Sequence, residues 1–518
     1  MDSNIQKKID HVIVLMLENR SLDNLMGWLY ENKEPKNFLP QDTPEALRKY
    51  NGLSGLDYSN RLDLEDPESS VDIVKGVSNF RVPNPVPNES FAEINRQQYG
   101  LEINKDTEGW LPKEEGIVPS MKGFLADYVT AKCSDRNIAP QIMETYTADD
   151  LSVISGIAKE YAISDNYHAS CPTQTWPNRA FMHTGTSEGH VNNSPYLPYT
   201  SKTIFNVLQD EGVSWRVYKS SHIIPSLTRI QMTQLWSPKL DGHFDSMERF
   251  YKECKTGELP AYSFLEPSFV LEKGDAASSE HPPANVCAGE LFLQQVWEAV
   301  VTSKNFERTL FIINFDEHGG CPDHVPPNWT AVPPDDKSQP GDLGFNFNRY
   351  GVRVPAIFVS PHIKKSTCVR ASTQPWDVAS VPFDHTSILA MILDWKKIDR
   401  NKVLGQRVSQ SIPNPFDELL TGDARVDRPL FKASCTFDGP GLLNRFINFC
   451  KGLFGLCSDD GKLSSLQKCL LCVDAHYRAA QKKGFAEGEF ASSESIHQLL
   501  QSVKTEKDIL AHFEKYKQ

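Results

Sequence analysis

The chain has 518 residues, of which 39% are hydrophobic, and a formal net charge of -13 at pH 7. A chain of this length can bury a large core, and it forms either about two to four domains or one large α/β domain with additions. The acidic balance argues against nucleic acid as a partner, because no basic surplus is left to neutralise phosphates. It does not exclude a phosphate that is bound through a metal ion.

The first apolar run of the chain, from Val12 to Leu17, ends at Glu18. This run is too short for the core of a signal peptide and far too short to span a membrane. We therefore expect synthesis in the cytoplasm without a Sec signal peptide, and no transmembrane segment. The cysteines number 11 and are spread along the chain without the density of a disulfide scaffold, so we expect reduced thiols.

The same run predicts a buried strand over residues 10–16, which delivers Glu18 and Asn19 at its carboxyl end. Ser21 then begins a short helix. From about residue 31 to residue 119 the pattern weakens into Pro, Asn, Asp and Ser, which predicts long surface loops. Beyond these loops, periodicity predicts helices at 122–128, 148–161, 288–303 and 388–395, strands at 161–165, 261–265, 309–315 and 353–360, and a helix followed by a strand within 201–217.

The strand at 309–315 organises the chain, because Asp316, Glu317, His318 and two glycines follow it directly. Open α/β sheets bind their ligands beyond the carboxyl ends of such strands, and hard oxygen ligands suit a divalent cation. The alternative is a strand that ends in a solvated acidic turn. We favour a site because the strand at 10–16 also ends in a carboxylate, and the two strands are expected to be neighbours in one sheet.

A candidate nucleophile lies in residues 170–183, where Thr175 comes shortly before Pro177. Proline is favoured at the first position of a helix, so the Thr175 hydroxyl is predicted to lie at the positive end of a helix dipole, beside backbone N–H groups that can receive phosphate charge. The alternative is an ordinary helix cap. His281, which precedes two prolines, is typical of a surface turn when it is considered alone.

The alternation of strands and helices predicts one sheet covered on both faces. After about residue 401 the strand signals end, which predicts a linker over 401–440 and a helical C-terminal extension over 441–518. An apolar stripe at 442–457 docks on the main domain or on a membrane surface. Four cysteines of the extension form either a thiolate cluster or part of a helix core: Cys450, Cys457, Cys469 and Cys472.

Six motifs of the chain, taken together and in order, resemble the phosphoesterase family that contains non-specific phospholipases C and bacterial acid phosphatases. They are Leu17 to Ser21, Thr175 to Arg179, Glu266-Pro267 with His281-Pro282, Asp316 to Gly320 with Asp323-His324-Val325, Gly351 to Pro355, and Asp384 to Ser387. The resemblance implies an alkaline-phosphatase-like α/β fold over residues 1–400, with a mostly parallel sheet, and phosphoester hydrolysis.

The resemblance also implies roles for single residues. Glu18, Asn19, Asp316, Glu317 and Thr175 would bind the metal. Thr175 would be the nucleophile, Asn178 and His281 would contact the phosphoryl group, and His385 and His324 match recurring histidines of the family. Zinc is the first choice of metal on the resemblance, while the oxygen-rich ligands also accept calcium or manganese.

A threonine nucleophile favours a phospholipase C that hydrolyses phosphatidylcholine-like lipids at a membrane surface. The rivals are an acid phosphatase with the same site and a silent binding protein. No protein partner is predicted. Two departures from the family pattern bear on substrate preference: segment 84–88 lacks an expected histidine, and Cys321-Pro322 replaces an aromatic pair. The C-terminal extension resembles that of phospholipase C virulence effectors of intracellular bacteria, which implies export into host cells by a specialised secretion system.

Overall fold

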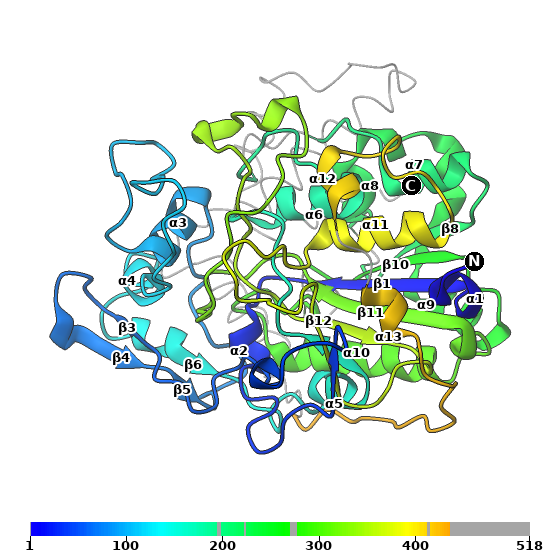
Figure 1. Ribbon diagram of the computed structural model, residues 1–518, viewed down its shortest axis with the longest axis horizontal. Helices are drawn as coiled ribbons and strands as arrows, with labels where there is room; N and C mark the ends of the chain where they lie inside the picture. Colours follow the sequence, from blue (N-terminus) through cyan, green and yellow to red (C-terminus); the bar gives the residue numbers. More distant parts are fainter. Residues whose placement is uncertain (1, 194–197, 222–223, 270–276, 412–414, 436–518) are drawn as a thin grey trace.

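A nine-stranded mixed sheet forms the centre of the protein (Figure 1). The computed structural model describes residues 2–193, 198–221, 224–269, 277–411 and 415–435. In spatial order the strands are β2 (Asn37–Leu39), β13 (Thr367–Val369), β7 (Ala162–Ser164), β12 (Ala356–Val359), β11 (Thr309–Phe315), β1 (His11–Leu17), β10 (Tyr262–Glu266), β8 (Trp215–Lys219) and β9 (Phe244–Ser246).

Strands β1 and β11 are parallel neighbours in the middle of this sheet, and Leu17 pairs with Phe315 at their carboxyl ends. Both strands are almost entirely buried, as their continuous apolar sequences predict for strands covered on two faces. Only β12 runs antiparallel to its neighbours, β11 and β7, while the other pairs in this sheet are parallel. The expected α/β sheet, mostly parallel, and the expected adjacency of the two central strands are therefore confirmed.

Helices cover both faces of the sheet (Figure 1). On one face lie α6 (Thr175–Thr184), α7 (Ile204–Asp210), α8 (Leu227–Gln231), α11 (His385–Trp395) and α12 (Gln406–Gln410); on the other lie α5 (Ser152–Glu160), α9 (Met247–Thr256) and α10 (Val286–Val301). Buried apolar side chains of these helices and of the strands form one large core.

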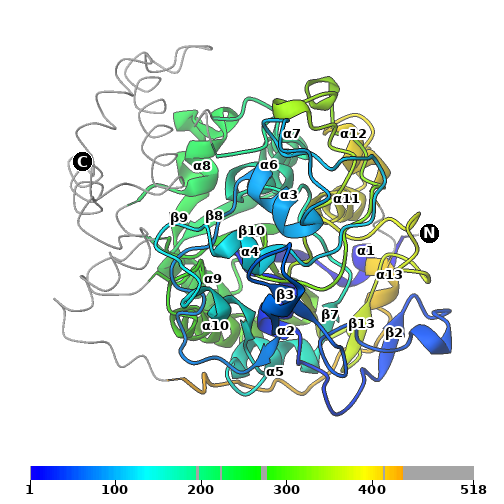
Figure 2. The same ribbon diagram turned by 90° about the vertical axis from the view of Figure 1, so that its left-hand side faces the viewer.

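The region from residue 59 to residue 145 packs over the end of the sheet to which β1 points (Figure 2). It contains two small sheets, β3 (Ser59–Arg61) with β4 (Ser70–Asp72) and β5 (Val74–Lys75) with β6 (Glu144–Thr145), and the helices α3 (Phe91–Tyr99) and α4 (Phe124–Tyr128). The prediction of surface loops is wrong for α3, which buries Phe91, Ile94 and Tyr99. Three further short helices are α1 (Asn4–Lys8), α2 (Leu22–Met26) and α13 (Pro415–Leu419).

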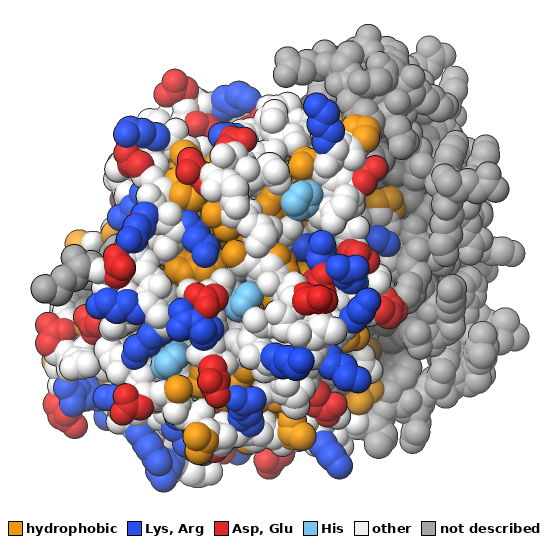
Figure 3. Space-filling view, turned by 90° about the vertical axis from the view of Figure 1, so that its right-hand side faces the viewer, with side chains coloured by type: hydrophobic (Ala, Val, Ile, Leu, Met, Phe, Trp, Pro, Cys, Tyr) orange, Lys and Arg blue, Asp and Glu red, His pale blue; other side chains and the backbone are white. Residues whose placement is uncertain are grey.

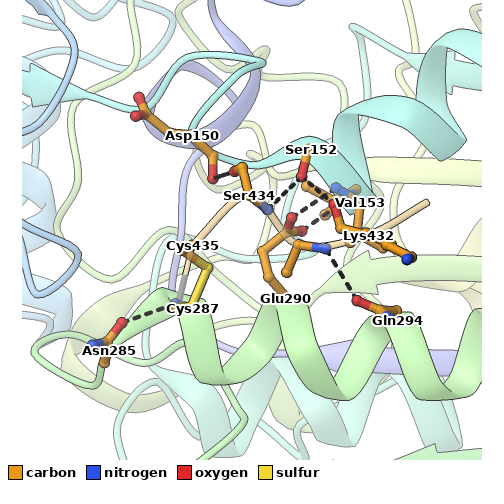
Figure 4. Close-up of a disulfide and its surroundings, with 12 residues drawn as sticks. Asp150, Ser152, Val153, Asn285, Cys287, Glu290, Gln294, Lys432, Ser434 and Cys435 are labelled. Carbon is orange, nitrogen blue, oxygen red and sulfur yellow. Dashed lines mark hydrogen bonds between the residues drawn. A yellow bond between two sulfur atoms is a disulfide. The ribbon is translucent and has the colours of Figure 1, made fainter. Parts of the chain in front are cut away.

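The segment 425–435, which the sequence assigns to a linker, packs against the main domain beside α5 and α10 (Figure 4). Ser434 donates to the Asp150 carbonyl and Ala433 N–H donates to Gln294. A disulfide joins Cys435 to Cys287 at the start of α10. The expectation of reduced thiols is wrong for this pair, because cysteines 148 positions apart meet only after folding. The predicted extension, 441–518, with its four cysteines, lies outside the described residues.

The face opposite the small sheets carries interspersed positive and negative side chains (Figure 3). No broad patch of one sign is visible on this face among the described residues. None of the described helices is long and apolar enough to cross a bilayer.

Candidate active site

The carboxyl ends of β1 and β11 bring two pairs of polar residues together. Asn19 N–H donates to Asp316 Oδ1 at 3.1 Å, and Glu317 N–H donates to the same oxygen at 2.8 Å. The Asn19 amide also donates to Glu317. All four residues of the two pairs, Glu18-Asn19 and Asp316-Glu317, are at most 1% exposed. The structure thus brings Glu18, Asn19, Asp316 and Glu317 into one buried cluster.

Two glycines allow the chain to turn tightly against this cluster. Gly319 has a φ of 61°, and a Cβ atom there would lie 2.1 Å from the Asn19 carbonyl oxygen. Gly320 has a φ of 69°, and its Cβ would lie 2.6 Å from Pro87. Only glycine combines this backbone conformation with so close an approach.

Thr175 lies at the first position of α6, and its hydroxyl donates to Asn19 Oδ1 at 3.2 Å. The helix therefore begins two residues earlier than Pro177 predicts, and the hydroxyl still lies at the positive helix end. Asn178 is buried in the same helix. Its amide donates to carbonyls of the preceding turn, with the shortest distance 2.9 Å to Thr173, so it braces the turn that carries Thr175. Its contact with a phosphoryl group stays a prediction.

Arg179, one helical turn after Thr175, is a site residue to which the sequence analysis assigned no role. Its Nε donates to Asp316 Oδ2 at 3.0 Å, and its Nη2 lies 3.6 Å from Glu18 Oε1. Its Nη1 is buried without a hydrogen-bond partner among the described residues. The sequence could have indicated this role, because Arg179 lies one helical turn after the candidate nucleophile Thr175 and therefore on the same face of the helix.

Glu89 also reaches the cluster, from the segment that was predicted to be a surface loop. Its Oε1 accepts a hydrogen bond from Asn19 Nδ2 at 3.1 Å and lies 3.6 Å from His281 Nε2. Glu89 is 9% exposed. The available signal was the capping box of Ser90 and Glu93, which marks the start of α3 directly after Glu89, but no local pattern predicts that Glu89 meets Asn19.

The cluster holds more negative charge than its protein partners neutralise. Burial, together with nearby carboxylates, raises the pKa of Glu317 well above its usual range. Burial also raises the pKa of Glu18 and of Glu89, despite Arg179 near the first and the Asn19 amide beside the second. A buried carboxylate with too few cationic partners disfavours its charged form.

The donor set fits a divalent cation. Both carboxylate oxygens of Glu18 are buried without a hydrogen-bond partner among the described residues. Buried oxygens without a partner lower the stability of the folded protein unless a cation or a hydrogen-bond donor binds them. The atoms that could hold the cation belong to Glu18, Asp316, Glu317, the Asn19 side-chain amide oxygen and the Thr175 hydroxyl, a hard oxygen set that suits calcium or manganese.

The three predicted histidines lie in different surroundings. His281 has its Nδ1 2.6 Å from the Pro282 carbonyl and its Nε2 toward Glu89. His385 lies behind the cluster, where its Nε2 is 2.7 Å from the Asp316 carbonyl and its Nδ1 is 3.0 Å from the Tyr167 hydroxyl. Burial lowers the pKa of His385, so the neutral ring holds the backbone of Asp316 in place.

His324 belongs to a second buried cluster, with Asp23, Asp323 and Arg353. Its Nδ1 lies 2.6 Å from Asp23 Oδ2, and Arg353 donates to Asp23 at 3.0 Å and to Asp323 at 2.9 Å. Candidate ligand atoms of Asp23, Asp323 and His324 lie within 4.8 Å of one another, the spacing of a metal site. Because the guanidinium already pairs with both carboxylates, we interpret this cluster as a structural ion network.

Comparisons with known proteins identify relatives of this chain. Non-specific phospholipase C6 of Arabidopsis thaliana is 30% identical over 75% of this chain and 68% of its own length. Non-specific phospholipase C4 of the same plant is 29% identical over 95% of this chain and 82% of its own length. A solved protein in the alkaline phosphatase superfamily from Vibrio parahaemolyticus aligns at 11% identity and a TM-score of 0.28, covering 49% of this chain and 62% of that one, a likeness too distant to support an inference.

The family model named "Phosphoesterase family" matches residues 9–397. This span includes both central strands, α6 and α11, and thus every residue of the cluster described above. The chain therefore belongs to the phosphoesterase family.

Proposed function

We propose that the protein is a divalent-cation-dependent phospholipase C. Its substrates would be glycerophospholipids such as phosphatidylcholine at a membrane surface, and its products diacylglycerol and a phosphorylated headgroup. Family membership makes the chain a phosphoric ester hydrolase, and the names of its relatives support phospholipids as the substrate class. Zinc is our first choice of cation, with calcium or manganese as alternatives.

The observation that carries the proposal is the position of the Thr175 hydroxyl. It lies at the start of a helix and is bonded to Asn19, and Asn19 is bonded to Asp316 and Glu317. A hydroxyl is a weak nucleophile at neutral pH and needs a neighbour that stabilises its deprotonated form. A bound divalent cation would supply that stabilisation and would also neutralise a phosphate oxygen.

The proposed reaction has two steps, each a displacement at phosphorus. In the first, Thr175 Oγ1, which has lost its proton to solvent, forms a bond to phosphorus as the bond from phosphorus to the diacylglycerol oxygen breaks, and the protonated His281 gives its proton to that oxygen. In the second, water attacks phosphorus and gives a proton to the now neutral His281, the bond to Thr175 Oγ1 breaks, and the phosphorylated headgroup leaves. The Nη1 of Arg179, which has no hydrogen-bond partner among the described residues, is available to an equatorial phosphate oxygen, whereas at the start of α6 the Trp176 N–H already donates to Asn193 and Pro177 has no N–H.

Replacing the hydroxyl tests this proposal. We expect Thr175→Ala to lower phosphatidylcholine hydrolysis by at least about 1,000-fold, because no nucleophile remains, while Thr175→Ser retains measurable turnover. The protein is chelated and then given zinc, calcium or manganese singly, and diacylglycerol and phosphocholine are both quantified. Circular dichroism checks that each variant is folded.

Full turnover by Thr175→Ala would exclude this residue as the nucleophile. Hydrolysis of soluble phosphomonoesters without hydrolysis of phosphatidylcholine would identify a phosphatase with the same site. Tight metal binding without turnover of any phosphoester would identify a binding protein.

A further inference from the structure

Glu89 is a buried carboxylate that the mechanism above does not use. It touches the same Asn19 side chain that receives the Thr175 hydroxyl. We infer that Glu89 is a positioning residue, which orients the Asn19 amide so that its oxygen faces Thr175 and the cation. This inference deepens the proposed function and rests on it for the identity of the site.

The hydrogen bonds of Asn19 define which way its amide points. Its Nδ2 donates to Glu89 Oε1 at 3.1 Å and to Glu317 Oε1. A carboxylate accepts and an amide nitrogen donates, so both neighbours require the nitrogen on their side. The Oδ1 atom consequently faces the Thr175 hydroxyl, at 3.2 Å. If the amide were reversed, Asn19 Oδ1 would face the acceptor oxygens of Glu89 and Glu317, and Nδ2 would face Thr175.

Cation binding increases the importance of Glu89. Glu317 belongs to the proposed ligand set, so a bound cation would compete with the Asn19 amide for its oxygen. Glu89 would then be the acceptor that keeps Nδ2 turned away from the cation. Outer partners of this kind orient metal ligands, and their loss typically weakens metal affinity by about 10- to 100-fold.

The backbone that carries Glu89 is held firmly enough for this role. The preceding residue, Asn88, receives a hydrogen bond on its carbonyl from Gln97 at 2.8 Å. The following residue, Ser90, caps α3, and its N–H donates to Glu93 at 2.9 Å. Glu89 therefore lies between a bonded carbonyl and a capped helix, which limits the freedom of its side chain.

Paired substitutions test the inference. Glu89→Gln keeps an oxygen that can accept from Asn19 Nδ2, whereas Glu89→Ala removes the acceptor. We expect Glu89→Ala to bind zinc about 10- to 100-fold more weakly than the wild type and Glu89→Gln to bind within about threefold of it. Affinity is measured by titration calorimetry on chelated full-length protein, with calcium and manganese in parallel, so the readout does not depend on turnover.

Glu93→Gln is the matched control, because it removes a nearby charge, in the first turn of α3, and leaves an oxygen to accept from Ser90. We expect its zinc affinity to equal that of the wild type. Unchanged affinity in Glu89→Ala would overturn the inference. Equal weakening in Glu89→Gln and Glu89→Ala would also overturn it, because Glu89 would then act through its charge or as a ligand.

The two proposals fail separately. A protein that hydrolyses phosphatidylcholine normally, with normal zinc affinity in Glu89→Ala, would refute the positioning role and leave the function intact. A wild type that hydrolyses no phospholipid, with zinc affinity lost in Glu89→Ala and kept in Glu89→Gln, would refute the function and support the positioning role.

Discussion

Two buried acidic clusters lie at the ends of the central strands, and they differ in how their charge is compensated. The second cluster places Asp23 and Asp323 on either side of Arg353, with His324 as a further partner. Burial by itself raises the pKa of Asp23, yet His324 and Arg353 outweigh it and hold that pKa below its usual range. In the first cluster, Arg179 is the described cation that pairs with Glu18 and Asp316.

We interpret the second cluster as a structural network and the first as a binding site. In the second cluster, side-chain and backbone donors hold the pKa of Asp23 low, although burial still raises the pKa of Asp323 to about 6 despite its pair with Arg353. In the first cluster, the oxygens of Glu18 have no hydrogen-bond partner among the described residues, and the pKa of Glu317 is strongly raised by burial. Buried carboxylates without compensating partners are typical of sites that bind a ligand or a metal ion.

The largest expected effect follows from removing the cation of the second cluster. Arg353→Met leaves the buried Asp323 without a cationic partner and Asp23 with His324 alone, and we expect the free energy of unfolding to fall by about 3–5 kcal/mol. Urea unfolding followed by circular dichroism measures the loss. Adding Asp23→Asn and Asp323→Asn to the same protein should recover part of it, because the unpaired charges are removed. A loss below about 1 kcal/mol would contradict a structural role for this network.

The next prediction, with a smaller expected effect, compares one carboxylate from each cluster. Asp23→Asn should lower the free energy of unfolding of metal-free protein by about 1.5–3 kcal/mol, because charged hydrogen bonds to Arg353 and His324 are lost. Glu18→Gln should leave the metal-free protein at least as stable as the wild type and weaken zinc affinity by more than about 100-fold. Calorimetric zinc titration and urea unfolding at pH 8 measure both. Equal destabilisation by the two substitutions would remove the distinction between the clusters.

The last prediction, whose effect is the smallest per pH unit, concerns Glu290, an intermediate case on α10. It accepts from the N–H groups of Val153 and Ile154, at 2.7 and 2.9 Å, and no described cation pairs with it. Burial raises its pKa to about 7 from an ordinary 4.5. The folded state therefore holds a proton that the unfolded state releases, so stability should fall as pH rises from about 4.5 to about 7, by at most about 1.4 kcal/mol per pH unit.

Glu290→Gln should flatten that part of the stability curve. Urea unfolding of wild type and variant at several pH values measures the difference between them, which removes the contributions of other groups. Parallel curves for the two proteins would show that Glu290 stays ionised, and that two backbone N–H groups compensate a buried carboxylate as well as a cation does.

The sheet and the four strand-end residues of the first cluster were predictable because both depend on local patterns. Continuous apolar runs identify β1 and β11, and the residues that follow each run must lie at the carboxyl ends of those strands. Thr175 was found from its position before a proline. The antiparallel direction of β12 has no comparable local signal, because direction in a sheet depends on the path of the connecting chain.

The remaining site residues depend on segments that meet only in the folded chain. Glu89 lies 70 positions from Asn19, and its approach requires α3 to dock over the sheet end. The disulfide between Cys287 and Cys435 similarly joins a helix start to a segment expected to be a linker. The local sequence of each segment does not indicate which distant residue the segment contacts.

The sequence by itself thus determined the strands, the carboxylates at their ends and the hydroxyl at a helix start, because burial and helix capping act over a few neighbouring residues. Only the tertiary structure decided which carboxylates pair with the same arginine side chain and which do not. That outcome depends on Arg179 and Arg353, each brought by the fold to acids far away in the chain, and the strength of such pairs is set by distance and burial.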